Sequence, residues 1–142
     1  MKEKRPDLRV FTWIRPYLAR WGMYRVLVVD DEKLEREGIR FLLSMEEGEW
    51  EIYEAANGKL ALNELRKHPV DLMLTDIKMP HMDGLEATRL IRSYSKEVPI
   101  VALTAFAFEP DKDRAIEAGC DDCLTKPVSQ NALEKVLDKY VK

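Results

Sequence analysis

Four short apolar segments of this sequence each run directly into a charged or hydroxyl side chain. The side chains at these ends are Asp30 with Asp31, then Asp76, Thr104 and Lys126. In a parallel sheet the carboxyl ends of the strands meet at one edge, which is where open α/β proteins place their sites. We therefore expect three carboxylates, a hydroxyl and an ammonium group to converge on one small volume.

Strand and helix signals alternate from residue 24 to the end of the chain. Predicted strands cover 24–29, 50–55, 70–75, 99–104 and 122–125, and predicted helices cover about 32–45, 58–67, 84–94, 110–118 and 129–141. Three of the strands are almost entirely apolar, as expected where helices cover both faces of a sheet. Charges in 50–55 favour an edge position for that strand. Five βα units with right-handed crossovers predict a doubly wound, five-stranded parallel sheet in a three-layer α/β/α fold.

Composition indicates a soluble globular protein with one main domain. The chain has 142 residues, 46% of them hydrophobic and 35% charged, with a net charge of -3. This charge does not favour direct nucleic-acid binding. We find no apolar stretch near the roughly 20 residues of a membrane span, and no secretory signal, so we expect no membrane partner and a cytoplasmic location. Only 16 residues follow Lys126, so we expect no effector domain after it.

Residues 1–22 differ in composition from the remainder of the chain. They carry a net charge of +4, against -7 for residues 23–142, and include four aromatic side chains. We predict a loosely ordered extension, because chain termini are commonly loose unless they are tied down. The alternative is a helix that docks on a partner or on a membrane surface. The folded domain is predicted to span residues 23–142.

The residues at the strand ends suit metal-assisted phosphoryl transfer. Asp30, Asp31 and Asp76 would repel one another, and such a cluster persists when a cation neutralises it. Mg²⁺ prefers oxygen ligands, so Asp31 and Asp76 could hold it while Asp30 orients a metal-bound water. Asp76 would act as the nucleophile, and Lys126 and Thr104 would contact phosphoryl oxygens. The alternative for Asp30 and Asp31 is that they only favour the start of the following helix.

These residues lie in four motifs that resemble the receiver domain of two-component response regulators, over about 23–142. The motifs are Val28–Glu32, Asp71–Gly84, Ala102–Ala105 and Leu124–Pro127. The resemblance implies a flavodoxin-like sheet of order 2-1-3-4-5 and a cis bond before Pro127. It implies that Asp76 accepts a phosphoryl group from a histidine kinase or a histidine phosphotransfer protein. It also implies that Mg²⁺ (or Mn²⁺) is bound directly by Asp31, Asp76 and the backbone carbonyl of Lys78, with Asp30 acting through water.

The resemblance further implies a conformational switch that joins Thr104 to an aromatic side chain on the last strand. Here that position is Cys123, and Phe106 and Phe108 are the alternative candidates. A downstream protein would bind the last helices and strand, and the chain would be a monomer or a phosphorylation-dependent dimer. Cys123 also leaves open an interaction scaffold that has the receiver fold but does not switch.

Other activities fit the sequence less well. We expect no turnover enzyme, because the module would catalyse only its own phosphorylation and dephosphorylation. An aspartyl-phosphate phosphatase would need a second acid at position 78, which is lysine here. A nucleotide or flavin binder would need a glycine- or hydroxyl-rich first loop in place of Asp30 and Asp31. Cys120 and Cys123 do not suggest a redox pair, because acidic residues separate them and would disfavour a thiolate.

Overall fold

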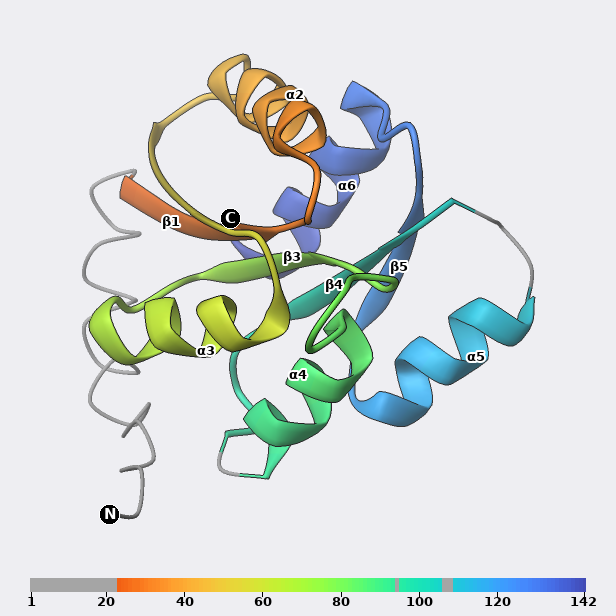
Figure 1. The fold of residues 1–142 in the computed structure, drawn as a ribbon. Helices are drawn as coiled ribbons and strands as arrows, with labels where there is room; N and C mark the ends of the chain where they lie inside the picture. The colour runs from red at the N-terminus through yellow and green to blue at the C-terminus, as the bar shows by residue number, and fades with distance from the viewer. Residues whose placement is uncertain (1–22, 94, 106–108) are drawn as a thin grey trace.

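The computed structural model describes residues 23–93, 95–105 and 109–142, and these form a single sheet between two layers of helices (Figure 1). The strands are β1 (Met23–Val29), β2 (Glu49–Ala55), β3 (Leu72–Asp76), β4 (Ile100–Thr104) and β5 (Asp122–Thr125). All neighbouring strands are parallel, in the order β2-β1-β3-β4-β5. The predicted fold is therefore confirmed. Residues 1–22, Phe106 and Phe108 lie outside the described residues, so the hypotheses about them stay predictions.

Within the residues that the structure describes, five helices connect and follow the strands, and each begins and ends within two residues of its predicted bounds. They are α2 (Lys33–Ser44), α3 (Gly58–Lys67), α4 (Gly84–Arg92), α5 (Glu109–Ala118) and α6 (Gln130–Tyr140). Helices α2 and α6 cover one face of the sheet, and α3, α4 and α5 cover the other (Figure 1). In the described part of the chain, no helix has the length and apolar character that a bilayer crossing requires.

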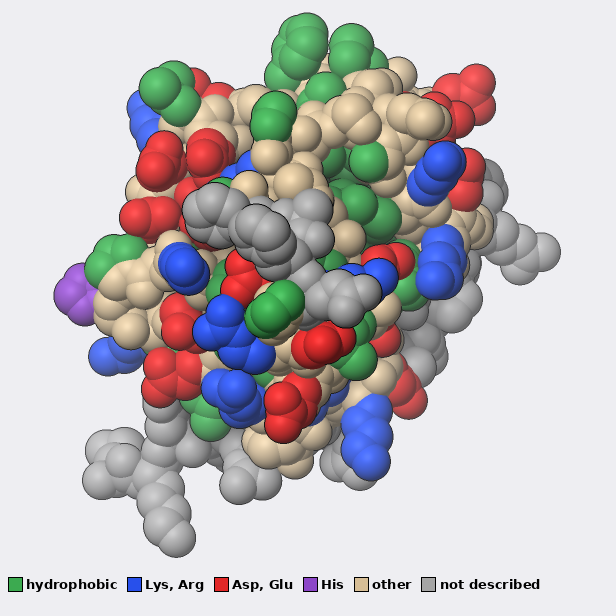
Figure 2. Space-filling model, turned by 90° about the vertical axis from the view of Figure 1, so that its right-hand side faces the viewer, with side chains coloured by type: hydrophobic (Ala, Val, Ile, Leu, Met, Phe, Trp, Pro, Cys, Tyr) green, Lys and Arg blue, Asp and Glu red, His purple; other side chains and the backbone are tan. Residues whose placement is uncertain are grey.

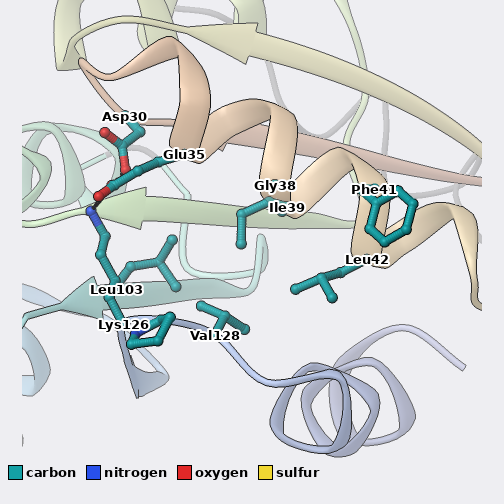
Figure 3. A pocket seen from close by; sticks show the side chains of 10 residues that line it. Asp30, Glu35, Gly38, Ile39, Phe41, Leu42, Leu103, Lys126 and Val128 are labelled. Carbon is teal, nitrogen blue, oxygen red and sulfur yellow. Dashed lines mark hydrogen bonds and ion pairs between the residues drawn. The ribbon is translucent and has the colours of Figure 1, made fainter.

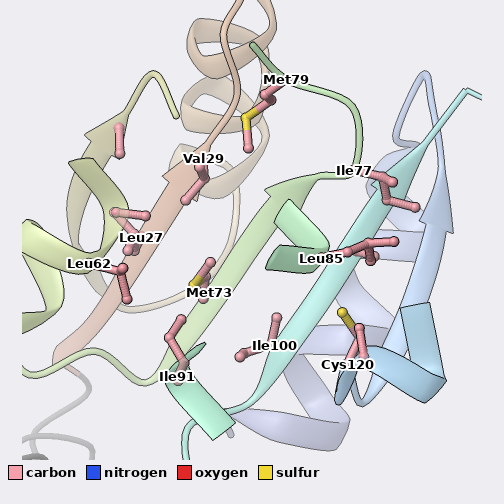
Figure 4. Close-up of a cluster of buried hydrophobic side chains, with 14 of the residues drawn as sticks. Leu27, Val29, Leu62, Met73, Ile77, Met79, Leu85, Ile91, Ile100 and Cys120 are labelled. Carbon is pink, nitrogen blue, oxygen red and sulfur yellow. The ribbon is translucent and has the colours of Figure 1, made fainter. Parts of the chain in front are cut away.

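Successive side chains of the central strands enter two separate cores. In β1, Leu27 and Val29 pack beneath α3, α4 and α5, whereas Val26 and Val28 pack beneath α2 and α6. Figure 4 shows the first of these cores, in which Met73 of β3 lies among side chains from both β1 and the covering helices. Because both faces are covered, the strands read as continuous apolar runs without polar alternation. The two cores hold the strand ends in fixed relative positions.

Strand β2 lies at the edge of the sheet, as its charges predicted. It pairs with β1, with Ile52 opposite Val26, and its residues Glu49 and Glu51 are exposed. Glu54 forms ion pairs with two arginines of α2, at 3.1 Å to Arg36 and 2.9 Å to Arg40. These ion pairs help to attach α2 to the edge strand, next to the carboxyl end of β1.

The segment between β3 and α4 is held tightly against the end of β3. The carboxylate of Asp83 accepts a hydrogen bond from the backbone N–H of Glu86 at 2.8 Å and so caps the N-terminus of α4. A Cβ at Gly84 would lie only 2.1 Å from the carbonyl oxygen of Asp76 and 2.7 Å from the hydroxyl of Thr75. Glycine at position 84 therefore allows α4 to begin directly beside the end of β3.

We predict that Gly84→Ala destabilises the protein and disturbs Asp76. The added methyl group collides with backbone atoms, which cannot rotate away as a side chain can, so β3 and α4 must separate. Overpacking of this kind costs about 1–3 kcal/mol of unfolding free energy. Urea denaturation measures this loss, and backbone amide NMR shifts at residues 75–77 measure the displacement.

Gly38→Ala is the matched control, because a Cβ at Gly38 in α2 meets no atom within 4 Å. Replacing a helix-interior glycine by alanine adds about 0.5–1 kcal/mol of stability where space is available. Equal effects of the two substitutions would show that the contact between Gly84 and Asp76 does not constrain the site.

Candidate functional site

Three strand ends bring Asp30, Asp76 and Lys126 into contact. Asp30 follows β1, Asp76 is the last residue of β3, and Lys126 follows β5. The Lys126 ammonium lies 2.8 Å from a carboxylate oxygen of Asp30 and 3.3 Å from one of Asp76. The segment after β5 is held in place by a hydrogen bond from the Lys126 backbone N–H to the Thr104 carbonyl, at 2.7 Å. The sheet therefore places the three side chains together as expected, while their chemical roles stay predictions.

Glu35 is a fourth member of this cluster that was not predicted from the sequence. Its carboxylate contacts the Lys126 ammonium directly. Carboxylate oxygens of Asp30, Glu35 and Asp76 all lie within 4.8 Å of one another. Glu35 belongs to the first turn of α2, and helical side chains tilt toward the N-terminus of their helix. The sequence signal for Glu35 was the presence of an acidic residue one helical turn after the Asp30-Asp31 pair.

The half-buried position of Lys126 is compatible with a charged ammonium because two carboxylates hydrogen-bond to it. Burial alone favours the neutral amine, but the hydrogen bonds to Asp30 and Glu35 and the charge of Asp76 outweigh it and raise the pKa of Lys126. The ammonium is therefore the stable form across the physiological pH range.

The three carboxylates respond differently to the same surroundings. Burial raises the pKa of Asp30, but hydrogen bonds with Glu35, Lys126 and the Glu32 backbone outweigh burial, so the pKa is lowered overall. The hydrogen bond with Asp30 raises the pKa of Glu35. For Asp76, burial and the charge of Asp30 raise the pKa despite the attraction of Lys126. The single positive charge of Lys126 therefore neutralises only part of the negative charge of the three carboxylates.

The donor set suits a hard cation. Three carboxylates from β1, β3 and α2 offer oxygen atoms within a space of 4.8 Å, and these are the ligands that Mg²⁺ and similar ions prefer. A divalent ion would also neutralise the negative charge that Lys126 leaves uncompensated. Asp30 and Asp76 are therefore placed to hold a metal ion, with Glu35 beside them.

Two predicted metal ligands, Asp31 and Lys78, differ from Asp30 and Asp76 because they are exposed. The side chain of Asp31 is exposed, and Asp31 is not part of the carboxylate cluster formed by the described residues. It follows β1 by two positions, so the chain has already turned away from the strand direction there. Lys78 lies just beyond the end of β3, and its side chain is exposed. Direct ligation by Asp31 and by the Lys78 carbonyl stays a prediction.

Thr104 and Cys123, the predicted switch residues, occupy neighbouring strands. Thr104 ends β4 and is 5% exposed, and its hydroxyl donates a long hydrogen bond of 3.5 Å to the Asp111 carboxylate at the start of α5. Cys123 lies opposite Ala102 in the β4–β5 register and packs against the core beneath α3, α4 and α5. A link from Thr104 to Cys123 stays a prediction.

The two cysteines are free thiols. Burial is the main cause that raises the pKa of Cys120, to about 11, and burial followed by the charge of Asp122 raises the pKa of Cys123. Raised pKa values are the opposite of what a redox-active thiol needs, which agrees with the reading of the C-x-x-C spacing as structural.

An apolar groove runs from the carboxylate cluster along α2. A cavity of about 370 Å³ opens between α2 and the segment after β5, and Lys126 lies at one end of it with Phe41 toward the other (Figure 3). Its apolar lining comes from both sides of this space, and the residues are Gly38, Ile39, Phe41, Leu42, Leu103, Pro127 and Val128. The charged site is thus continuous with a hydrophobic surface.

Comparison with known proteins identifies the family. The response regulator receiver domain matches residues 26–138. The chain is 42% identical over 120 residues to the two-component response regulator ORR41 of Oryza sativa subsp. japonica, covering 83% of this chain and 94% of that protein. It is 39% identical over 117 residues to the sensor histidine kinase RcsC of Salmonella typhi, covering 81% of this chain but only 12% of the kinase. The chain therefore belongs to the response regulator receiver domains of two-component signalling.

Solved structures share the fold. The receiver domain of sensor histidine kinase PA1611 from Pseudomonas aeruginosa PAO1, which has a magnesium ion coordinated in its active-site cleft, matches with a TM-score of 0.75 and 30% identity over 83% of this chain and 97% of that one. The receiver domain of Ssk1 from Saccharomyces cerevisiae, in complex with the histidine phosphotransfer protein Ypd1, matches with a TM-score of 0.75 and 30% identity over 84% of this chain and 89% of that one.

We predict that Lys126→Met lowers stability most at neutral pH. The variant leaves the buried Asp30 without its cation, at a cost of about 1–3 kcal/mol of unfolding free energy. The lowered pKa of Asp30 contributes stability above its ordinary value of 3.8, and this contribution is lost as the pH falls. The difference from the wild type should therefore be large at pH 7 and should shrink only below pH 3.8, as measured by urea denaturation at pH 7 and pH 3.

Lys33→Met is the control for this experiment. Lys33 lies on α2 with its side chain 79% exposed, and it pairs only loosely with Glu37, at 3.8 Å. Its removal should change the unfolding free energy by no more than about 0.5 kcal/mol at either pH. A Lys126→Met penalty that is the same at pH 7 and pH 3 would contradict the charge-balance account.

Proposed function

We propose that Asp76 is the phosphoryl acceptor of this receiver domain, in a reaction that requires Mg²⁺ or Mn²⁺. The observation that carries the proposal is the position of the Asp76 carboxylate. It lies 3.3 Å from the Lys126 ammonium, beside two other acids, and its side chain retains 14% exposure to solvent. Asp76 is thus close to positive charge and still accessible to a donor.

The reaction transfers a phosphoryl group from a phosphohistidine to Asp76. An Asp76 carboxylate oxygen forms a bond to phosphorus while the bond from phosphorus to the imidazole nitrogen breaks, and the imidazole leaves with that electron pair. Lys126 is placed to contact the phosphoryl oxygens, where it would offset negative charge. The Thr104 hydroxyl, which makes a long hydrogen bond to Asp111 in the unphosphorylated protein, would donate to another of these oxygens.

The metal ion would neutralise charge on the phosphoryl oxygens and on the surrounding carboxylates. The proposed ligands are Asp76, Asp31 and the Lys78 carbonyl, with Asp30 acting through water. Support comes from the oxygen donors at the strand ends and from the magnesium ion in the related receiver domain. The domain changes only its own phosphorylation state, so we do not class it as a turnover enzyme.

We further propose that the donor, a histidine kinase or a histidine phosphotransfer protein, docks on α2. Leu34 and Phe41 of α2 and Met45, the residue that caps its C-terminus, are 80%, 63% and 53% exposed, and their spacing puts them on the same face as Gly38. In Figure 2, which faces the edge where the strands end, hydrophobic side chains gather at the top, where Figure 1 places α2. Such a stripe suits an apolar helix of a partner. The Ypd1–Ssk1 complex supports a partner of this class.

We also propose which surface binds a downstream protein and where in the cell the domain acts. A downstream protein would contact the surface formed by α5, β5 and α6, and the domain would act as a monomer or as a dimer that forms on phosphorylation. The free thiols of Cys120 and Cys123 agree with the reducing conditions of a cytoplasmic location.

We predict that Asp76→Asn abolishes phosphorylation. With Mg²⁺ and acetyl phosphate, the wild type should gain the mass of one phosphoryl group, and the variant should gain none because an amide is not a nucleophile of this kind. Intact-protein mass spectrometry measures the gain. Asp138→Asn, an exposed acid on α6, should be phosphorylated like the wild type. Persistence of the added mass in Asp76→Asn, or in wild type treated with EDTA, would refute the assignment.

We predict that Phe41→Ala slows transfer from a protein donor but not from acetyl phosphate. Loss of a central aromatic anchor typically costs an interface more than 1 kcal/mol, which corresponds to roughly five- to tenfold in rate under subsaturating donor. The measurement is single-turnover transfer from a phosphorylated histidine phosphotransfer protein that serves the wild type. Leu60→Ala, which removes a 45% exposed side chain from α3, is the control. Equal rates for both variants would exclude α2 as the docking surface.

A further inference from the structure

Glu35 and Asp76 use the same ammonium group. An ammonium has three N–H donors, and the Lys126 ammonium faces three carboxylates, those of Asp30, Glu35 and Asp76. Hydrogen bonds to Asp30 and Glu35 use two of these donors, and Asp76 lies 3.3 Å from the ammonium as an ion pair. A phosphoryl group on Asp76 adds acceptor oxygens and about -2 charge at neutral pH. For Lys126 to donate to that group more than the N–H that now faces Asp76, its contact with Asp30 or Glu35 must be given up.

Of the two competing acids, Glu35 is the one that can leave. Asp30 is 2% exposed, and its other carboxylate oxygen accepts a hydrogen bond from the Glu32 backbone N–H at 2.9 Å. Glu35 is 37% exposed and reaches Lys126 from the first turn of α2, so water can solvate its carboxylate after release. Figure 3 shows Glu35 beside Asp30, at the mouth of the apolar groove.

We propose that Glu35 is a positioning residue that holds Lys126 in the unphosphorylated protein and competes with the phosphoryl group on Asp76 for it. This inference rests on the proposed role of Asp76. Glu35 acts in two ways. Its contact keeps one N–H of Lys126 away from the phosphoryl oxygens, and its negative charge repels an anionic group entering the site. Both effects disfavour the phosphorylated state, so Glu35 sets how readily the domain is modified.

A metal ligand and a competitor of the phosphoryl group differ in how their replacement changes the affinity for that group. Replacing a ligand would weaken binding of the metal and of a phosphoryl group together. Replacing a competitor of the phosphoryl group strengthens phosphoryl binding once the metal site is saturated. A substitution that merely loosened the fold would not tighten any ligand.

The test measures the affinity of beryllofluoride, a stable stand-in for the phosphoryl group, by ¹⁹F NMR titration at saturating Mg²⁺. Glu35→Gln should bind beryllofluoride roughly three- to tenfold more tightly than the wild type, as expected for removal of one nearby charge and one hydrogen bond. Glu35→Asp keeps the charge but shortens the side chain by one methylene, so it should still bind about twofold more tightly. Phosphorylation by acetyl phosphate should accelerate in the same order.

Glu37→Gln is the matched control, because Glu37 lies on the same helix, is 52% exposed and pairs with Lys33. It should match the wild type. Unchanged or weaker beryllofluoride binding by Glu35→Gln would overturn the proposal, and so would a wild-type affinity for Glu35→Asp, which would show a general effect of charge. If instead the wild type gains no phosphoryl mass, or Asp76→Asn gains it, the assignment of Asp76 itself fails.

Discussion

The ammonium group of Lys126 is the interaction on which this site depends. It joins the ends of β1, β3 and β5 through Asp30 and Asp76, and it joins α2 to them through Glu35. Without a cation, three neighbouring carboxylates would repel one another or take up protons. With one ammonium the cluster is stable yet still short of positive charge. That shortage is the physical reason why a divalent ion suits the site.

The fold keeps this cluster in place with structure on both sides of the sheet. Two cores clamp the central strands, and the close contact of Gly84 with the Asp76 backbone fixes where β3 ends and α4 begins. The ion pairs of Glu54 with Arg36 and Arg40 hold α2 against the edge strand. The positions of Asp76 and Glu35 therefore follow from packing at some distance from the charges themselves.

Helix α2 links recognition to chemistry in the proposed mechanism. Its exposed face offers Leu34, Phe41 and Met45 to a donor, and its first turn carries Glu35 to Lys126. A donor that docks on this helix would therefore contact the same element that restrains the ammonium. The apolar groove between α2 and the segment after β5 joins the two regions.

The fold and the core of the site could be predicted because their signals are local or depend only on chain order. Apolar runs marked the strands, and Asp30, Asp76 and Lys126 stood at strand ends, where any parallel sheet must gather them. The charges of the second strand predicted its position at the edge of the sheet. Glu35 could not be predicted because a helical residue reaches the site only if the rotation of its helix about its axis points that residue toward the strand ends.

By itself, the sequence determined the order of strands and helices and the kinds of side chain at each strand end, because hydrophobic periodicity and capping act over a few residues. Only the tertiary structure decided which acids share the ammonium. Asp31, predicted as a member, is exposed, whereas Glu35 contacts Lys126 across 91 positions of the chain. That choice depends on how α2 packs against β1 and the segment after β5, and such packing is set by the whole core.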